Sequence, residues 1–447
     1  MPHPLLYLVV FIEGYCSLGA EIIALRRLVP HMGSAIVVTA PTIGLFLLAL
    51  ALGYASGARV ADRFQTVVAR NFLIAALLTG FGFARFTVDG LFSVLSPSWL
   101  AYLVLMCGVL CPLAWLLGQT VPVLTNLMKH SRSGEASGYA LYWSTLGSFA
   151  GSVSLSLLVM QWLGVSASVL ACTTLLAAGS LLLGGPRKPA VWSAMGVTVV
   201  AWVIHLVPSQ PVLDTAYADY QVKPLHLAGQ HQPRGFMVNN SLASLLDDSS
   251  PPQYARYVQR MRRILLDELR LSGADILVLG AGGFTLSHQE MSNRYTYVDI
   301  DPAIRTLAEQ HFLKQPIAGT FVVDDARRFV RNTEQRHAAV VVDVFSNHSS
   351  IPSHLVTAEF WSDTRRALEP NGHLLINLIL DSQLASPYAR NVLGTIESVY
   401  GRCATEVLQR HQALANVIVI CPASGQPSGT RIYTDERNGA DLDKLVQ

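Results

Sequence analysis

The sequence predicts a two-part fold: a bundle of transmembrane helices followed by an α/β domain with a doubly wound, mainly parallel sheet. The 447-residue chain is 51% hydrophobic and only 14% charged, whereas about a quarter of the residues are charged in ordinary soluble proteins. Residues 1–207 hold only 10 Lys or Arg and 5 Asp or Glu, so most charges lie in the second half. There, from residue 272 onward, short β-branched runs alternate with amphipathic helical stretches.

The first half contains seven apolar stretches of the length that a membrane helix needs, which is about 20 residues for 30 Å of hydrocarbon. Because lipid offers the backbone no hydrogen-bonding partner, we expect a helical bundle in the lipid bilayer over residues 1–207. Small residues such as Gly147 and Gly151 would let its helices pack closely. The seven stretches lie at about 5–26, 35–56, 71–88, 99–127, 138–160, 164–184 and 190–207.

Two carboxylates, Glu13 and Glu21, interrupt the first of these stretches. A charge inside a membrane is costly, so each carboxylate should face a partner or a wet cavity. One interpretation is a path for a substrate or a proton. The other is a structural contact with Arg26, Arg27 or a neighbouring helix.

The six cysteines show no paired framework, and four of them lie in apolar stretches. Nothing in their spacing requires an oxidising compartment. Cys107 and Cys111 lie one helical turn apart, and we interpret them as small buried residues rather than as a metal or redox pair. No metal site is expected.

The second half divides into three predicted parts. Residues 208–260 form a linker and a small β-hairpin domain, 261–430 form the α/β domain, and 431–447 form a polar tail. Within the α/β domain, helices are expected at 302–310 and 358–368. Ligands of such a sheet bind beyond the carboxyl ends of its strands. The strands, which read as buried on both faces, are predicted at 275–279, 295–299, 320–323, 339–343 and 373–379.

A glycine-rich turn follows the first of these strands and contains Gly280, Gly282 and Gly283. Glycines allow a tight turn and a close approach of the backbone to a ligand. Asp299 ends the second strand 19 positions after Gly280, the spacing at which a carboxylate accepts hydrogen bonds from ribose hydroxyls. The turn lacks the third glycine of the dinucleotide motif and the lysine of a P-loop. We therefore expect an adenosine without a pyrophosphate.

Two further carboxylates follow the third and fourth strands. Asp325 could accept a hydrogen bond from an adenine amino group, or it could simply cap the next helix. Asp343 ends a fully apolar strand, where an unpaired carboxylate is costly unless it has a partner or a catalytic role. We interpret Asp343 as a general base, with capping of a turn as the alternative.

Together these residues resemble the polyamine aminopropyltransferases, the spermidine synthase family, in the bacterial branch that is fused to a membrane bundle. The resemblance covers about 215–425. Tyr220 and Gln221 resemble the Tyr-Gln opening of the family's N-terminal β-hairpin domain, and Tyr257 resembles the tyrosine of the helix before the sheet. The implied fold of the α/β domain is Rossmann-like, of the class I S-adenosylmethionine-methyltransferase type.

The resemblance also implies roles for the carboxylates. Asp299 would hold the ribose, Asp325 would lie near adenine, and Asp343 would deprotonate an attacking amine. The implied reaction moves an aminopropyl group from decarboxylated S-adenosylmethionine to a small-molecule amine and releases methylthioadenosine. A homodimer is implied by the family, whereas the net charge of +2 and the lack of a basic stripe argue against a nucleic-acid partner.

Two positions depart from the family pattern. Gly283 and Ser346 stand where spermidine synthases carry an aspartate near the donor's amine and a second aspartate that grips the acceptor. The usual diamine reaction is therefore in doubt, and intact S-adenosylmethionine could be the donor. His348, His354 and Asp381 could replace the acceptor carboxylate, or they could be ordinary loop residues.

Two alternatives to aminopropyl transfer stay open. The same pocket could support a methyltransferase or a lyase of S-adenosylmethionine. Alternatively, the bundle could be a polyamine or metabolite carrier whose second half senses a nucleoside. The glycine and Asp-Arg loop at 53–63 resembles that of major-facilitator transporters.

The orientation of the chain is a point of conflict. Loops after even-numbered spans carry seven Lys or Arg and the opposite set carries three, so the positive-inside rule places the N-terminus in the cytoplasm. Seven spans then place the second half outside. We nevertheless expect a multi-pass protein of the inner membrane with a cytoplasmic catalytic domain, because the implied donor is a cytosolic metabolite.

Overall fold

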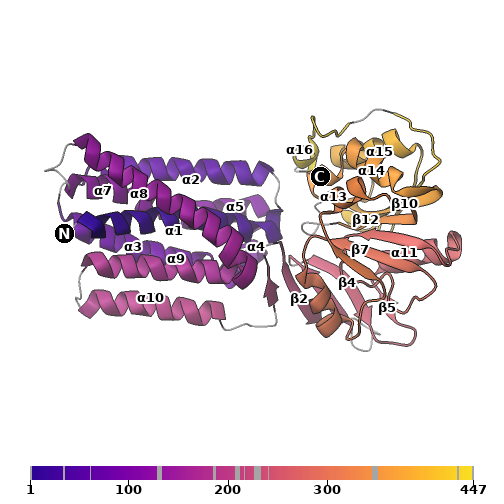
Figure 1. The fold of residues 1–447 in the computed structure, drawn as a ribbon, viewed down its shortest axis with the longest axis horizontal. Coiled ribbons are helices and arrows are strands. Elements are labelled where there is room, and N and C mark those ends of the chain that lie inside the picture. Colours follow the sequence, from indigo (N-terminus) through magenta and orange to yellow (C-terminus); the bar gives the residue numbers. More distant parts are fainter. Residues whose placement is uncertain are drawn as a thin grey trace. The chain divides into compact units, whose positions relative to one another are not determined.

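The computed structural model describes residues 3–33, 36–60, 62–127, 133–184, 188–206, 212–215, 217–225, 233–239, 241–344, 351–429 and 432–444. The chain forms two compact units (Figure 1). The helical unit extends to residue 210, and the main part of the sheet unit begins at Tyr217. Each unit is described by itself.

The described part of the helical unit is built from apolar helices, some long and some of only eight to ten residues. Two short π-helical segments, Met106–Leu110 and Leu155–Val159, interrupt its α-helices. The helices are α1 (His3–Met32), α2 (Ile36–Gly57), α3 (Phe64–Gly82), α4 (Arg85–Val94), α5 (Ser98–Leu105), α6 (Cys111–Gly118), α7 (Thr120–Leu127), α8 (Ser133–Ser154), α9 (Met160–Gly184) and α10 (Lys188–Leu206).

Five segments of the described chain are long and apolar enough to cross a membrane. The longest of them, Gly134–Leu183, has 50 residues, which as one straight helix would measure about 75 Å. Gly164 interrupts it with non-helical backbone angles (φ 82°, ψ 174°), so it divides into two segments of membrane length. Helix α10 adds a shorter apolar segment, Trp192–Leu206. Counted with it, the described residues provide seven apolar segments.

The expected position of the third span, 71–88, is wrong. Helix α3 begins at Phe64 and ends at Gly82, and Arg85 begins a separate short helix, α4. A charged residue such as Arg70 is expected in a loop rather than in an apolar span. In the structure, Arg70 lies within α3 and its side chain is exposed.

Helices α1 and α8 pack closely through small residues, as the sequence predicts. A Cβ atom on Gly147 would lie 2.1 Å from the Phe11 carbonyl oxygen, and one on Gly14 would lie 2.0 Å from the Ser144 carbonyl oxygen. The Ser144 hydroxyl donates to the Glu13 carboxylate at 2.8 Å. Glu13 therefore has a polar partner on the neighbouring helix, as a carboxylate inside the bundle requires.

The sheet unit begins with a five-stranded sheet in the order β1-β2-β3-β4-β5. Strands β2 to β5 pair antiparallel with their chain neighbours. The strands are β1 (Val212–Asp214), β2 (Asp219–Pro224), β3 (Arg234–Val238), β4 (Ser241–Asp247) and β5 (Gln253–Tyr254).

A seven-stranded sheet follows, in the order β11-β12-β10-β9-β6-β7-β8. The five strands from β10 to β8 in this order are parallel, and β12 and β11 are added antiparallel at one edge. Its strands are β6 (Asp275–Leu279), β7 (Arg294–Asp299), β8 (Thr320–Val323), β9 (His337–Val342), β10 (Leu368–Asp381), β11 (Ala404–Val407) and β12 (Leu414–Pro422).

Helices cover both faces of this sheet because its central strands are apolar on both sides. Leu277 and Val340 pack in one core with Trp361 of α14, whereas Val278 and Val341 pack in a second core. The doubly wound domain is therefore confirmed. Its helices are α11 (Arg256–Arg263), α12 (Ala303–Leu307), α13 (Ala326–Asn332), α14 (Ala358–Arg366), α15 (Pro387–Tyr400) and α16 (Ala440–Lys444).

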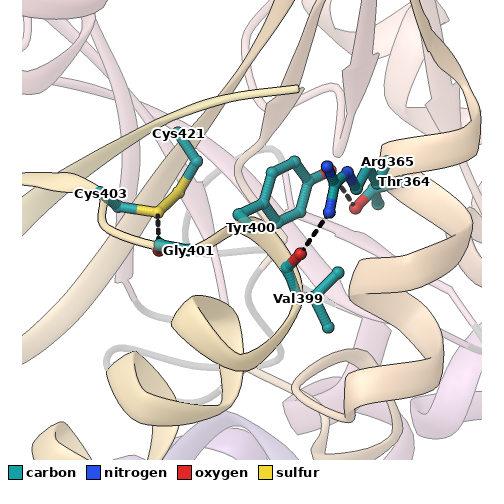
Figure 2. The surroundings of a disulfide bond; sticks show 7 residues. All are labelled: Thr364, Arg365, Val399, Tyr400, Gly401, Cys403 and Cys421. Carbon is teal, nitrogen blue, oxygen red and sulfur yellow. Dashed lines mark hydrogen bonds between the residues drawn. A yellow bond between two sulfur atoms is a disulfide. The ribbon is translucent and has the colours of Figure 1, made fainter. Parts of the chain in front are cut away.

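The expectation that no cysteines are paired is wrong. Cys403 and Cys421 form a disulfide, which joins the chain just before β11 to β12 (Figure 2). Spacing along the sequence does not reveal this pair, because it depends on the antiparallel register of two strands. Cys107 is exposed rather than buried, which also differs from the expectation.

Candidate functional site

The glycine-rich turn and Asp343 lie next to each other because β6 and β9 are parallel neighbours. Leu279 at the end of β6 is opposite Val342 at the end of β9. The backbone N–H of Asp343 donates to the Leu279 carbonyl oxygen at 2.9 Å. The chain continues into Gly280 on one strand and into Asp343 on the other, so the two features meet at the carboxyl edge of the sheet.

Gly280 requires a glycine for two reasons. Its φ angle of +90° lies in the left-handed region, and a Cβ atom there would lie 2.3 Å from the Asp343 carbonyl oxygen. Any other residue would push the turn away from β9. Gly282 also has a positive φ angle, +51°.

A small cavity of ≈ 20 Å³ lies beside this turn. That volume accommodates one small group, so a whole nucleoside would have to extend beyond it. Its lining includes Ser244, Tyr257, Met261, Gly280, Gly282 and Asp343.

Asp343 is held by a chain of amide side chains. The Asn377 amide nitrogen on β10 donates to Asp343 Oδ1 at 2.8 Å, and the Asn416 amide nitrogen on β12 donates to Asn377 Oδ1 at 3.0 Å. Burial raises the pKa of Asp343 to about 6, although the hydrogen bond from Asn377 lowers it in part. The carboxylate therefore exchanges a proton near neutral pH, as a general base requires.

Sequence reasoning missed Asn377 and Asn416. Asn377 is 2% exposed and is a polar residue in the middle of the apolar run His373–Ile379. A buried amide needs hydrogen-bonding partners, so an asparagine within an apolar strand could have been recognised as a candidate site residue. Asn416 could not be linked to it without the pairing of β10 and β12.

Tyr257 lies on α11 and lines the cavity, as the resemblance implies for the site. Its hydroxyl donates to the Ala243 carbonyl oxygen at 2.5 Å. Burial raises the pKa of Tyr257 well above its ordinary value, and the nearby Asp343 charge adds to this increase. The hydroxyl is thus neutral and serves as a hydrogen-bonding group.

Asp299 braces the glycine-rich turn. Its Oδ2 accepts the Ala281 N–H at 3.0 Å and its Oδ1 accepts the Asp301 N–H at 3.1 Å. Burial raises its pKa despite these hydrogen bonds. Each carboxylate oxygen has a second lone pair, so ribose hydroxyls could still bind.

Asp325 has the capping role that was its alternative interpretation. Its Oδ1 accepts the Arg328 N–H at 2.9 Å at the start of α13, and its Oδ2 lies 3.8 Å from His354 Nε2. It does not line the cavity beside Asp343. A contact with adenine would have to occur outside that cavity, along the same edge of the sheet.

Two other expected site residues lie apart from the cavity lining. Gln221 lies on β2, opposite Met237. The Gly283 N–H donates to Ser244 Oγ at 2.9 Å, and a Cβ atom on Gly283 would lie 2.4 Å from the Phe312 ring. The space for a side chain at residue 283 is therefore filled by Phe312, which explains why an aspartate is missing there.

The turn does not begin a helix, because residues 280–293 are all described and none is helical. A bound pyrophosphate usually sits at the N-terminus of such a helix. The described turn therefore offers no such helix N-terminus. Ser346 and His348 lie outside the described residues. Asp381 is the last residue of β10 and accepts hydrogen bonds from the Ala385 and Ser386 N–H groups of the turn that follows.

Comparisons with known proteins support the resemblance, although no family model matches the chain. The chain is 31% identical to a polyamine aminopropyltransferase of Vibrio vulnificus over 134 residues, which are 28% of this chain and 43% of that protein. It is also 32% identical to an eEF1A lysine and N-terminal methyltransferase homolog of Drosophila melanogaster over 132 residues, 27% of this chain and 20% of that protein.

A longer match involves both halves. Polyamine aminopropyltransferase 1 of Streptomyces coelicolor is 24% identical over 413 residues, 83% of this chain and 75% of that protein. Residues 208–447 are little more than half of the chain, so this match extends into the helical half. A probable spermidine synthase of Corynebacterium glutamicum superimposes with a TM-score of 0.41 and 19% identity over 48% of this chain and 81% of its own.

These matches confirm the resemblance to polyamine aminopropyltransferases that the motifs indicate. The chain spans less than half the length of the first relatives, 43% and 45%.

Proposed function

We propose that this protein is a membrane-anchored, spermidine synthase-like transferase. It would move an aminopropyl group from decarboxylated S-adenosylmethionine to a small amine and release methylthioadenosine. The observation that carries the proposal is Asp343: a carboxylate with a pKa of about 6 beside a glycine-rich turn, in a chain similar to polyamine aminopropyltransferases.

The proposed step needs little more than alignment and a neutral amine. The amine nitrogen attacks the carbon bonded to the sulfonium, the carbon–sulfur bond breaks, and its electron pair stays on sulfur as a neutral thioether. Asp343 accepts the proton that the amine loses. The ≈ 20 Å³ cavity beside Asp343 and Tyr257 suits the reacting amine, while the nucleoside lies along the edge with Asp299 at its ribose.

Product analysis tests this proposal. The detergent-solubilised protein is incubated with decarboxylated or intact S-adenosylmethionine, each with and without a diamine, and the nucleoside product is identified by mass spectrometry. We expect methylthioadenosine that depends on both the decarboxylated donor and the amine. Methylthioadenosine without an amine would indicate a lyase, and a nucleoside that raises the melting temperature without any product would support a sensor.

Methyl transfer is the second candidate, because two observations favour it. Phe312 fills the space where an aspartate would bind the donor's amine in spermidine synthases, and a methyltransferase homolog is among the relatives. In the same assay this activity would form S-adenosylhomocysteine from the intact donor.

The proposal also includes a homodimer, which light scattering of the purified protein would test.

A further inference from the structure

The disulfide connects two strands at the edge of the seven-stranded sheet. Ala404 is opposite Ile420 in the antiparallel β11–β12 pair, so Cys403 and Cys421 occupy the next facing positions. Their Cα atoms are 4.6 Å apart, and Figure 2 shows the bond beside Gly401. Cys421 is completely buried. The pair is therefore part of the sheet's edge.

The disulfide-bonded and the free cysteines lie in different units. The two cysteines of the sheet unit are bonded to each other, whereas the free cysteines all lie in the helical unit: Cys16, Cys107, Cys111 and Cys172. Structural disulfides persist in oxidising compartments and are rare in the cytosol. This distribution favours a sheet unit outside the cytoplasm.

The positive charges in the loops of the helical half independently favour the same side of the membrane. Seven Lys or Arg belong to the loops after even-numbered spans and their flanks, against three in the opposite set. The positive-inside rule places the first set, and with it the N-terminus, in the cytoplasm. If the two parts of Gly134–Leu183 and the shorter apolar helix α10 each cross the membrane, the chain has seven spans, and α10 ends on the other side.

We propose that the sheet unit faces the extracytoplasmic side of the membrane, with Cys403 and Cys421 oxidised in the cell. This reverses the cytoplasmic placement expected from the donor alone. If the proposed transferase function is also correct, its amine acceptor and its sulfonium nucleoside must both be encountered outside the cytoplasm. The placement itself rests on the disulfide and the charges, not on the activity.

A pair of single-cysteine additions tests the placement in intact cells. Ala58, in the turn after α2, and Ser428, in the sheet unit, are both exposed. A membrane-impermeant maleimide should label Ser428→Cys in intact cells and Ala58→Cys only after the cells are opened. The parent chain corrects for its own exposed Cys107. Labelling of Ala58→Cys but not Ser428→Cys in intact cells would overturn the proposal.

Thiol trapping tests the disulfide. Cells are quenched in acid, and the denatured chain is alkylated with a heavy maleimide before or after reduction. We expect two additional alkylations after reduction in the parent chain and none in the double variant Cys403→Ser/Cys421→Ser. Equal alkylation of the parent chain before and after reduction would show that both thiols are free and would contradict the proposal.

The result does not depend on catalysis. Both experiments can be repeated with Asp343→Asn, which should give the same labelling. A parent chain with this labelling pattern but no product in the transferase assay would refute the proposed function and leave the placement intact. A parent chain with transferase activity and the reverse labelling pattern would do the opposite.

Discussion

Asp343 owes its proposed role to residues on neighbouring strands. Its carboxylate accepts a hydrogen bond from Asn377, whose own oxygen accepts one from Asn416. Asn377 lies on β10, next to β9, and Asn416 lies on β12, one strand further out, so the chain of hydrogen bonds exists only in the folded sheet. The sequence predicted Asp343 because a carboxylate ended an apolar strand, and it could not predict the amides, because their contacts depend on register.

Removal of the Asn377 amide should change the pH dependence of activity. Asp343 must be ionised to accept a proton, so the rate should fall as the pH falls through about 6. The hydrogen bond from Asn377 stabilises the ionised form, so Asn377→Leu should raise the pKa and move the acid limb to higher pH. Rates measured from pH 5 to 9 check this, and an unchanged acid limb would show that Asn377 does not position Asp343.

Gly280 offers a test of the turn with a matched control. Gly280→Ala places a Cβ atom against the Asp343 carbonyl oxygen, whereas Gly273, also at positive φ (+68°), has open space around it. Gly273→Ala should cost only the backbone strain, of order 1 kcal/mol. Gly280→Ala should cost more and weaken nucleoside binding, as calorimetry would measure. Equal effects of the two variants would argue against a tight turn beside β9.

The elements of the sheet unit were largely predictable. The expected strands at 275–279 and 320–323 coincide with β6 and β8. β6 is buried on both faces and leaves a continuous apolar run. β8 is instead a half-exposed edge strand, so the expectation that it is buried on both faces is wrong, although its β-branched and aromatic residues still mark it as a strand. β10 extends well beyond its expected 373–379 to Leu368–Asp381. Its ends could not be recognised as strand, because they are polar and only pairing, of Leu368 with β9 and of Asp381 with β12, marks them.

Asp325 caps a helix, and its predicted contact with adenine stays a prediction. Its carboxylate caps α13, and the Ser386 hydroxyl caps α15 in the same way. Asp325→Ala and Ser386→Ala should each destabilise the fold by about 1 kcal/mol. Only Asp325→Ala should also weaken nucleoside binding if Asp325 contacts adenine. Unchanged binding in both variants would leave Asp325 as a cap alone.

The α1–α8 contact can be tested within one helix. Gly147 packs against the Phe11 carbonyl oxygen, whereas Gly138, also on α8, has nothing within 4 Å of a Cβ position. Gly147→Leu should force the helices apart and lower the melting temperature of the solubilised protein by several degrees, as overpacking costs about 1–3 kcal/mol. Gly138→Leu should change it little. A similar decrease in both variants would contradict the close packing.

For the whole molecule, composition alone separated the two halves, because apolar membrane helices contain few charged residues and the α/β domain contains many. The side of the membrane was less accessible. The count of Lys and Arg in the loops placed the second half outside the cytoplasm, whereas the assumed cytosolic donor placed it inside. The third observation, the Cys403–Cys421 disulfide, depends on the pairing of β11 with β12 and could not be predicted from the sequence.

The most direct test of the central claim compares Asp343→Asn with the parent chain in two assays. One measures amine-dependent release of methylthioadenosine from decarboxylated S-adenosylmethionine, and the other measures the Kd of that donor by calorimetry. We predict that release falls by about 10²- to 10⁴-fold, as expected for loss of a general base, while the Kd changes little. Release at the parent rate, or a Kd weakened as much as the rate, would contradict the assignment of Asp343 as the base.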